Sequence, residues 1–180
     1  MTIGGLMSVF NYNTANDTLR SATASRLTIG PNNVFEPDGE WRPRALGVPP
    51  ALARDATGLP FPTVVFEVAC SETTSSLHSL APIYLGANTT IQLYVAIKIV
   101  PRRGNGTFAM LALLYSRANI PVTTPIQAIS CGTAPIVQRF LPPLLQPPLL
   151  TGVGVPPAAG MQPAPLATKP DSRNINSICH

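Results

Sequence analysis

Three apolar runs near the middle of the chain predict strands. Residues 63–70, 91–100 and 107–115 are rich in β-branched and aromatic side chains, which favour extended structure. The first run is apolar at odd and even positions alike, as expected for a central strand that is covered on both faces. Pro62 precedes this run, and Pro101 closes the second.

The segment between the first two runs has the spacing of a helix. Leucine, alanine and tyrosine recur at helical intervals over residues 77–84, and Ser/Thr residues suited to an N-cap precede them. Pro82 predicts a kink or a helix in two pieces. Strand, helix and strand form one right-handed crossover with parallel strands, and the turn at Asn105-Gly106 predicts an antiparallel hairpin into the third strand.

The remaining sequence is less regular. We expect a weak helix over 5–20, a short strand over 25–29, a strand over 34–41 that Pro37 interrupts, a proline-rich loop over 42–62 and an edge strand over 126–131. Together these elements predict an α/β fold with a mixed central sheet and flanking helices.

The C-terminal part has a different composition. Nine of the thirty residues from 141 to 170 are proline, which removes backbone donors and leaves no apolar periodicity. We therefore expect a domain over 1–140 and a disordered tail over 141–180. A Pro/Leu-rich tail can also dock a protein partner, and a homodimer is the other assembly we consider.

Charge and cysteine content bear on the partners of the protein and on its cellular compartment. Charged residues make up 11% of the chain, and the net charge of +4 permits contact with DNA without requiring it. The three cysteines lack zinc-site spacing and fit a reducing compartment. Because we find neither a signal peptide nor a run of about 20 apolar residues, we expect an intracellular protein outside the membrane.

Two charged residues interrupt the apolar strands. Glu67 lies within the first run, and Lys98 lies between Ile97 and Ile99 in the second. A lone charge on a buried strand costs several kcal/mol unless it is paired, protonated or bound to a metal. Glu67 is therefore a functional ligand or one half of a structural ion pair, for which Lys98 or an arginine is the partner.

A second acid, Asp38, suggests a chemical reaction for this group of charged residues. Asp38, Glu67 and Lys98 are the minimum set for metal-dependent phosphodiester hydrolysis, in which two carboxylates hold Mg²⁺ and a lysine stabilises developing charge. Asp38 also precedes Gly39, where aspartate is a common turn residue.

Four arginines are candidates for binding nucleic acid. Arg42, Arg44, Arg102 and Arg103 either contact phosphates or form a solvated loop surface.

These motifs resemble the PD-(D/E)XK nuclease superfamily, and within it the Uma-type restriction-endonuclease-like domain. The resemblance covers about residues 25–115: Pro37-Asp38, then a strand ending Glu67-Val68-Ala69-Cys70-Ser71, then a helix and a further strand. It implies a restriction-endonuclease-like core and a metal site with Asp38 as the first acid and Glu67 as the second.

The chain departs from the family pattern at the lysine. The pattern places lysine two residues after the second acid, where this sequence has Ala69. In the Uma type a helix residue can replace that lysine, and the helix here offers only His78. Lys98 is the candidate substitute from the next strand.

Three interpretations follow from the sequence. The first is a Mg²⁺-dependent DNA endonuclease with Asp38 and Glu67 as metal ligands and Lys98 as a catalytic residue. The second is a catalytically inactive descendant of the fold that acts as a binding module, which the absence of lysine at position 69 favours. The third is an unrelated α/β scaffold in which Glu67 and Lys98 form an ion pair.

Overall fold

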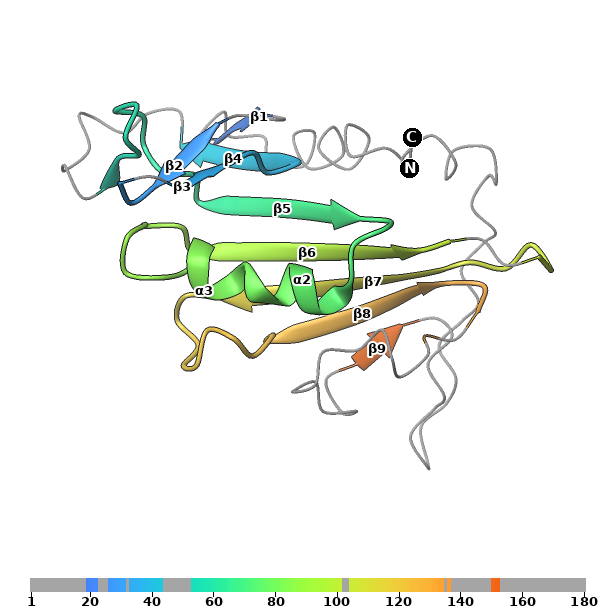
Figure 1. The fold of residues 1–180 in the computed structure, drawn as a ribbon. Coiled ribbons are helices and arrows are strands. Elements are labelled where there is room, and N and C mark those ends of the chain that lie inside the picture. Colours follow the sequence, from blue (N-terminus) through green and yellow to red (C-terminus); the bar gives the residue numbers. More distant parts are fainter. Residues whose placement is uncertain are drawn as a thin grey trace.

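The protein is built on one large mixed sheet. In the computed structural model, the described residues are 19–22, 26–31, 33–43, 53–101, 104–134, 136 and 150–152. The strands are β1 (Leu19–Ala22), β2 (Leu27–Ile29), β3 (Asn33–Phe35), β4 (Gly39–Pro43), β5 (Val64–Ala69), β6 (Leu93–Val100), β7 (Ala109–Ser116), β8 (Gln127–Gly132) and β9 (Leu150–Gly152), and the helices are α2 (Thr74–Ser79) and α3 (Ala81–Tyr84). The main sheet has the order β1-β4-β5-β6-β7-β8-β9, and β2 and β3 form a separate hairpin (Figure 1).

The centre of the sheet follows the sequence prediction. The three apolar runs form β5, β6 and β7, which are adjacent in the sheet. Strands β5 and β6 are parallel, and β6 and β7 are antiparallel, as the crossover and the Asn105-Gly106 turn predict. Gly106 has a positive φ of 79°, which glycine adopts without steric cost. The predicted mixed α/β character is therefore present.

The helical crossover is in two pieces, as Pro82 predicts. Thr73 caps α2, because its side-chain oxygen accepts a hydrogen bond from the Ser76 N–H at 3.0 Å. Helix α2 ends at Ser79, and α3 begins at Ala81 with Pro82 in its first turn. Proline fits that position because the first helical N–H groups have no partner within the helix.

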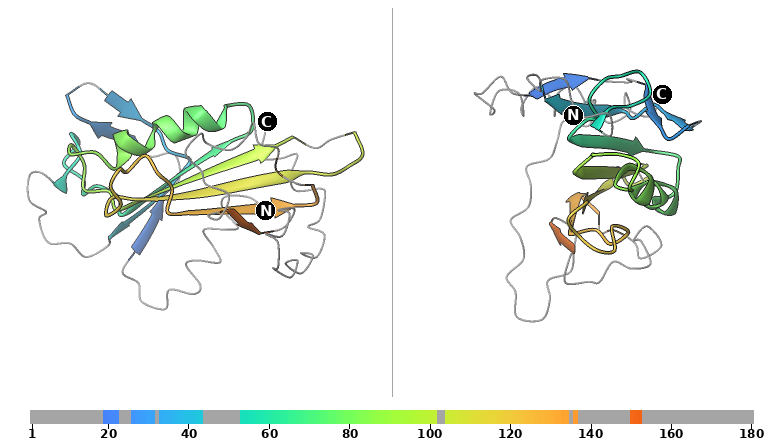
Figure 2. Two further views of the ribbon diagram at one scale, coloured as in Figure 1. Left: turned by 90° about the horizontal axis from the view of Figure 1, so that it is seen from below. Right: turned by 90° about the vertical axis from the view of Figure 1, so that its left-hand side faces the viewer.

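The two faces of the sheet are covered differently. Helices α2 and α3 and the β2–β3 hairpin lie over one face (Figure 2). Leu77 from α2 and Leu27 from β2 are buried there in one cluster with Val65 and Tyr94 of the sheet. Each such fully buried side chain stabilises the fold by about 1.5–3 kcal/mol. The opposite face carries a smaller cluster around Trp41 and Val64.

Pro37 interrupts the strand expected over 34–41, as the sequence predicts. Pro37 is buried and lacks the N–H that a continuous strand would need. The chain leaves the hairpin after β3 and enters the main sheet at β4, which pairs with both β1 and β5. The interrupted strand expected over 34–41 is therefore two strands in different sheets, and Asp38 lies at the junction between them.

Other predicted elements are revised at the edges of the sheet. Residues 19 and 20, the end of the helix expected over 5–20, belong instead to strand β1, and residues 5–18 lie outside the described residues. The predicted edge strand is β8, but β9 pairs with it in parallel, so β8 is internal. Strand β9 falls in the expected tail over 141–180, whose other residues lie outside the described part, as does the boundary at Phe140.

No helix in the part of the chain that the structure describes is both long and apolar enough to cross a membrane.

Candidate metal centre

The pairing of β4 with β5 brings the two candidate acids together. Gly39 pairs with Phe66 in an antiparallel register, which places Asp38 opposite Glu67 when continued by one residue. The two segments are also joined by hydrogen bonds: the Val68 N–H donates to Asp38 Oδ2 at 2.7 Å, and the Asp38 N–H donates to the Glu67 carboxylate. The structure thus joins the Pro-Asp motif to the acid of β5.

Glu67 is a half-buried acid with an altered affinity for protons. Burial raises its pKa from 4.5 to about 7, and the nearby charge of Asp38 adds to this shift. The Tyr84 hydroxyl opposes the shift by donating to Glu67 Oε1 at 2.5 Å. Near neutral pH, both the protonated and the ionised forms of Glu67 are therefore populated. This is unusual for a carboxyl group and typical of functional sites.

Lys98 lies beside Ala69, the position at which the family pattern has lysine. In the parallel pairing of β5 with β6, Ala69 is the partner of Lys98, so both side chains project from the same face of the sheet as Glu67. Lys98 is 4% exposed, and its Nζ donates to the Cys70 carbonyl at 2.5 Å. Burial lowers its pKa, while the charge of Glu72 acts in the opposite direction.

Glu67 and Lys98 do not form an ion pair with each other in the structure. Glu67 accepts from Tyr84 and from the backbone of Asp38, and Lys98 donates to a backbone carbonyl. The ion pairs found among the described residues involve Arg26 and Arg42 instead. Each strand charge is therefore satisfied separately.

The two carboxylates are suited to a hard divalent cation. Mg²⁺ prefers oxygen ligands and is commonly held by one or two carboxylates, with water and substrate phosphate completing its coordination. Among the described contacts, Asp38 Oδ1 makes no hydrogen bond, so it is available as a ligand. No cluster of three or more His, Cys, Asp or Glu side chains suited to a metal occurs within the described ranges.

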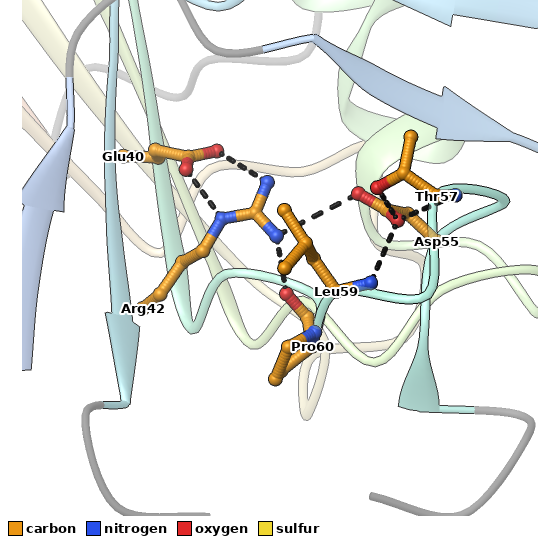
Figure 3. Close-up of polar contacts among 6 residues, drawn as sticks. All are labelled: Glu40, Arg42, Asp55, Thr57, Leu59 and Pro60. Atoms are coloured by element: carbon orange, nitrogen blue, oxygen red, sulfur yellow. Dashed lines mark hydrogen bonds and ion pairs between the residues drawn. The ribbon is translucent and has the colours of Figure 1, made fainter.

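Arg42, a candidate for binding nucleic acid, lies instead in a buried polar cluster (Figure 3). Its Nε and Nη2 donate to the two oxygens of Glu40, the second at 3.2 Å, and its Nη1 donates to the Pro60 carbonyl at 2.5 Å. The same Nη1 lies 3.6 Å from Asp55 Oδ2. Its guanidinium is therefore occupied inside the protein. Arg44, Arg102 and Arg103 lie outside the described residues.

The sequence analysis did not predict this Glu40–Arg42–Asp55 cluster. Glu40 and Asp55 are 1% and 5% exposed, so both carboxylates depend on internal donors. Asp55 Oδ1 accepts from the Thr57 N–H at 2.9 Å and the Leu59 N–H at 3.2 Å, which shapes the loop before β5. The available signal was the i, i+2 spacing of Glu40 and Arg42, which puts both on one face of a strand.

His78 is half-buried and belongs to the aromatic core, not to the acid pair. Its Nδ1 forms a hydrogen bond with the Tyr115 hydroxyl at 3.0 Å, and burial lowers its pKa. None of the contacts found for His78 involves Asp38 or Glu67. It therefore does not take the place of the missing lysine.

The cysteines differ from the expectation of a reducing compartment. Cys70, directly after β5, is disulfide-bonded, whereas Cys131 of β8 is a free thiol.

Comparisons of the chain with protein-family models, with curated proteins and with solved structures gave no significant match.

Proposed function

We propose that this protein is a Mg²⁺-dependent DNA endonuclease of the PD-(D/E)XK type, with a restriction-endonuclease-like core. The order of elements supports this proposal: Asp38 precedes β4, β5 carries Glu67 near its end, and two short helices lead to the parallel strand β6. The Uma-type resemblance implies the same succession of acid, strand, helix and strand.

The observation that carries the proposal is the placement of Glu67 beside Asp38, with Lys98 on the same face of the neighbouring strand. Asp38, which directly precedes β4, lies close enough to Glu67 of β5 for its charge to raise the pKa of that carboxyl, and Lys98 of β6 lies beside Ala69. These residues are 60 positions apart in the sequence at their extremes (98 minus 38), so no local structural need groups them. The face that Glu67 and Lys98 share also carries most of the apolar core, where charged groups are kept only at a cost.

Each residue has a defined role in the proposed reaction. Asp38 and Glu67 supply carboxylate oxygens to the cation, and Glu67 must lose its proton to do so. Lys98 supplies a positive charge to the phosphate, which requires its ammonium to leave the Cys70 carbonyl or to be shared with it. Bound Mg²⁺ would polarise the phosphate and lower the pKa of an attacking water.

DNA contact is part of the same proposal. In the sequence, Arg102 and Arg103 come shortly after β6, the strand of Lys98, and Arg44 comes directly after β4. We propose that these three contact phosphates, since arginine binds phosphate oxygens in a bidentate manner. Arg42 is not included, because its donors are used by Glu40, Asp55 and Pro60.

A second function is favoured by one observation. The Lys98 ammonium is engaged by the Cys70 carbonyl, and the lysine position of the motif holds Ala69. A descendant of the fold that binds a partner without cleaving DNA would have this arrangement. The two functions differ in whether cation binding is followed by cleavage.

The test combines cation binding with cleavage. Wild type should bind Mn²⁺ or Mg²⁺ in calorimetry and nick supercoiled plasmid, while Asp38→Asn and Glu67→Gln should lose both. Glu36→Gln is the control, because Glu36 is exposed and paired with Arg26 at a distance of 3.2 Å. Absence of cation binding by wild type would contradict the endonuclease, and binding without cleavage would favour the second function.

The position of the lysine allows a sharper version. Lys98→Ala should reduce cleavage by about 10²-fold or more, as expected for loss of a group that stabilises transition-state charge. Adding Ala69→Lys to that variant should restore part of the activity, because positions 69 and 98 are neighbours on one face. Lys169→Ala, which removes the other lysine of the chain, should leave cleavage unchanged.

A further inference from the structure

Tyr84 is held in a single place by its neighbours. Its side chain is fully buried at the end of α3, between Phe35 of the hairpin and Tyr94 of β6, with ring centroids 5.6 and 5.3 Å away. Its backbone N–H donates to the Leu80 carbonyl at 2.9 Å. The hydroxyl cannot turn away from Glu67 without displacing these rings.

Contacts after α3 fix the other end of the same residue. The Thr89 hydroxyl donates to the Tyr84 carbonyl at 2.5 Å, and Arg117 Nη2 donates to that Thr89 Oγ1 at 2.8 Å. Arg117 also donates to the Gly86 and Ile91 carbonyls, each at 2.8 Å. A guanidinium from the end of β7 thus stabilises the turn that carries Tyr84.

Glu67 has few other constraints. A glutamate side chain on a strand has several accessible rotamers, and no other side chain of the described residues donates to this carboxylate. Together with the backbone of Asp38, the phenol therefore sets the direction in which the carboxylate points. We propose that Tyr84 is the positioning residue of Glu67: its hydroxyl holds Oε1, which keeps the carboxylate beside Asp38 in the orientation that receives a cation.

The effect of this orientation on the cation rests on the proposed function. Tyr94 shows that a buried phenol in this core has another way to satisfy its hydroxyl. Tyr94 is also fully buried, but its hydroxyl donates to the Leu77 carbonyl at 2.8 Å. The two tyrosines differ mainly in their acceptor, so Tyr94 provides a matched control.

The test observes the Glu67 carboxyl group directly. The full chain, with ¹³C in the side-chain carboxyl of glutamate, gives one signal for each of its four glutamates, and Glu67→Gln assigns the signal of interest. Spectra are recorded at about pH 9, roughly two units above the pKa of Glu67, so that a change reports the lost hydrogen bond and not a change in protonation. Tyr84→Phe should move the Glu67 signal, and Tyr94→Phe should leave it in place.

A second measurement follows the cation. Mn²⁺ binding by calorimetry should weaken at least about tenfold in Tyr84→Phe, as is common when a group that orients a metal ligand is removed, and should be unchanged in Tyr94→Phe. If the Glu67 signal or the Mn²⁺ affinity responds equally to the two substitutions, the positioning role is overturned. If wild type binds no Mn²⁺, the proposed endonuclease fails, while the carboxyl signal still decides whether Tyr84 orients Glu67.

Discussion

At the scale of the residue, the environment of Glu67 differs from that of an ordinary strand residue. It is an acid on an apolar face with a phenol on one oxygen and a second acid across the strand pair. The protein keeps this group where its charged form is disfavoured, although an apolar residue would suit the sheet better. The pKa of Glu67 therefore depends on its burial, on the Tyr84 hydroxyl and on the charge of Asp38.

The shifted pKa of Glu67 predicts a pH-dependent stability. The pKa of its carboxyl group is near 4.5 in the unfolded chain and about 7 in the folded protein, so the folded state retains the proton longer. Stability is therefore lost as the pH rises through this window, by on the order of 2 kcal/mol after allowance for partial exposure. In chelator, Glu67→Gln should match wild type at about pH 5 and exceed it by this amount at about pH 8.

Urea unfolding at both pH values measures this difference. A structural ion pair would give the opposite sign, since its loss destabilises by about 3–5 kcal/mol. Added Mg²⁺ should raise the stability of wild type and not that of the variant, because only a bound ion stabilises by mass action. Equal pH profiles for the two proteins would contradict the shifted pKa.

At the scale of the element, the crossover between β5 and β6 depends on two adjacent threonines with different roles. Thr73 is the N-cap of α2, and its hydroxyl accepts from the Ser76 N–H. Thr74 is buried, and its Oγ1 finds no hydrogen-bond partner within the described structure. The same type of side chain is therefore favourable at one position and costly at the next.

The same substitution at these two positions should give different results. Thr73→Val should destabilise the fold by about 1 kcal/mol, because valine cannot cap the helix. Thr74→Val keeps the shape and removes an unsatisfied hydroxyl, so it should be neutral or stabilising by up to about 1 kcal/mol. Chemical denaturation of both variants checks the pair, and an equal loss at the two positions would contradict the assigned roles.

At the scale of the whole molecule, the central elements could be predicted from the sequence and the polar contacts could not. Runs such as 91–100 and the proline at position 82 act locally, so β6 and the divided helix follow from the sequence pattern. The interruption at Pro37 also follows from the sequence, but a strand pattern does not reveal that the two halves belong to different sheets. Contacts such as that between Tyr84 and Glu67 depend on how a helix packs on a sheet, and the local spacing of residues does not predict that packing.

Arg42 connects segments that are distant in the sequence, and its removal should affect the whole fold. Arg42→Met would leave Glu40 and Asp55 buried without their cation, and we expect a loss of about 3–5 kcal/mol. Arg26→Met is the control: the Arg26–Glu36 pair is exposed, so the change should stay within about 0.5 kcal/mol. Urea unfolding of both variants measures the difference, and similar losses would show that the buried cluster contributes little.

The pairing of Ala69 with Lys98 has an evolutionary consequence. The two positions are 29 residues apart in the chain (98 minus 69), yet they are neighbours on one surface of the sheet. A lysine can therefore be lost from one strand and gained on the other while the positive charge stays in nearly the same place. Under the proposed function, natural selection acts on the pair, and related sequences should carry lysine at one of the two positions and a small or apolar residue at the other.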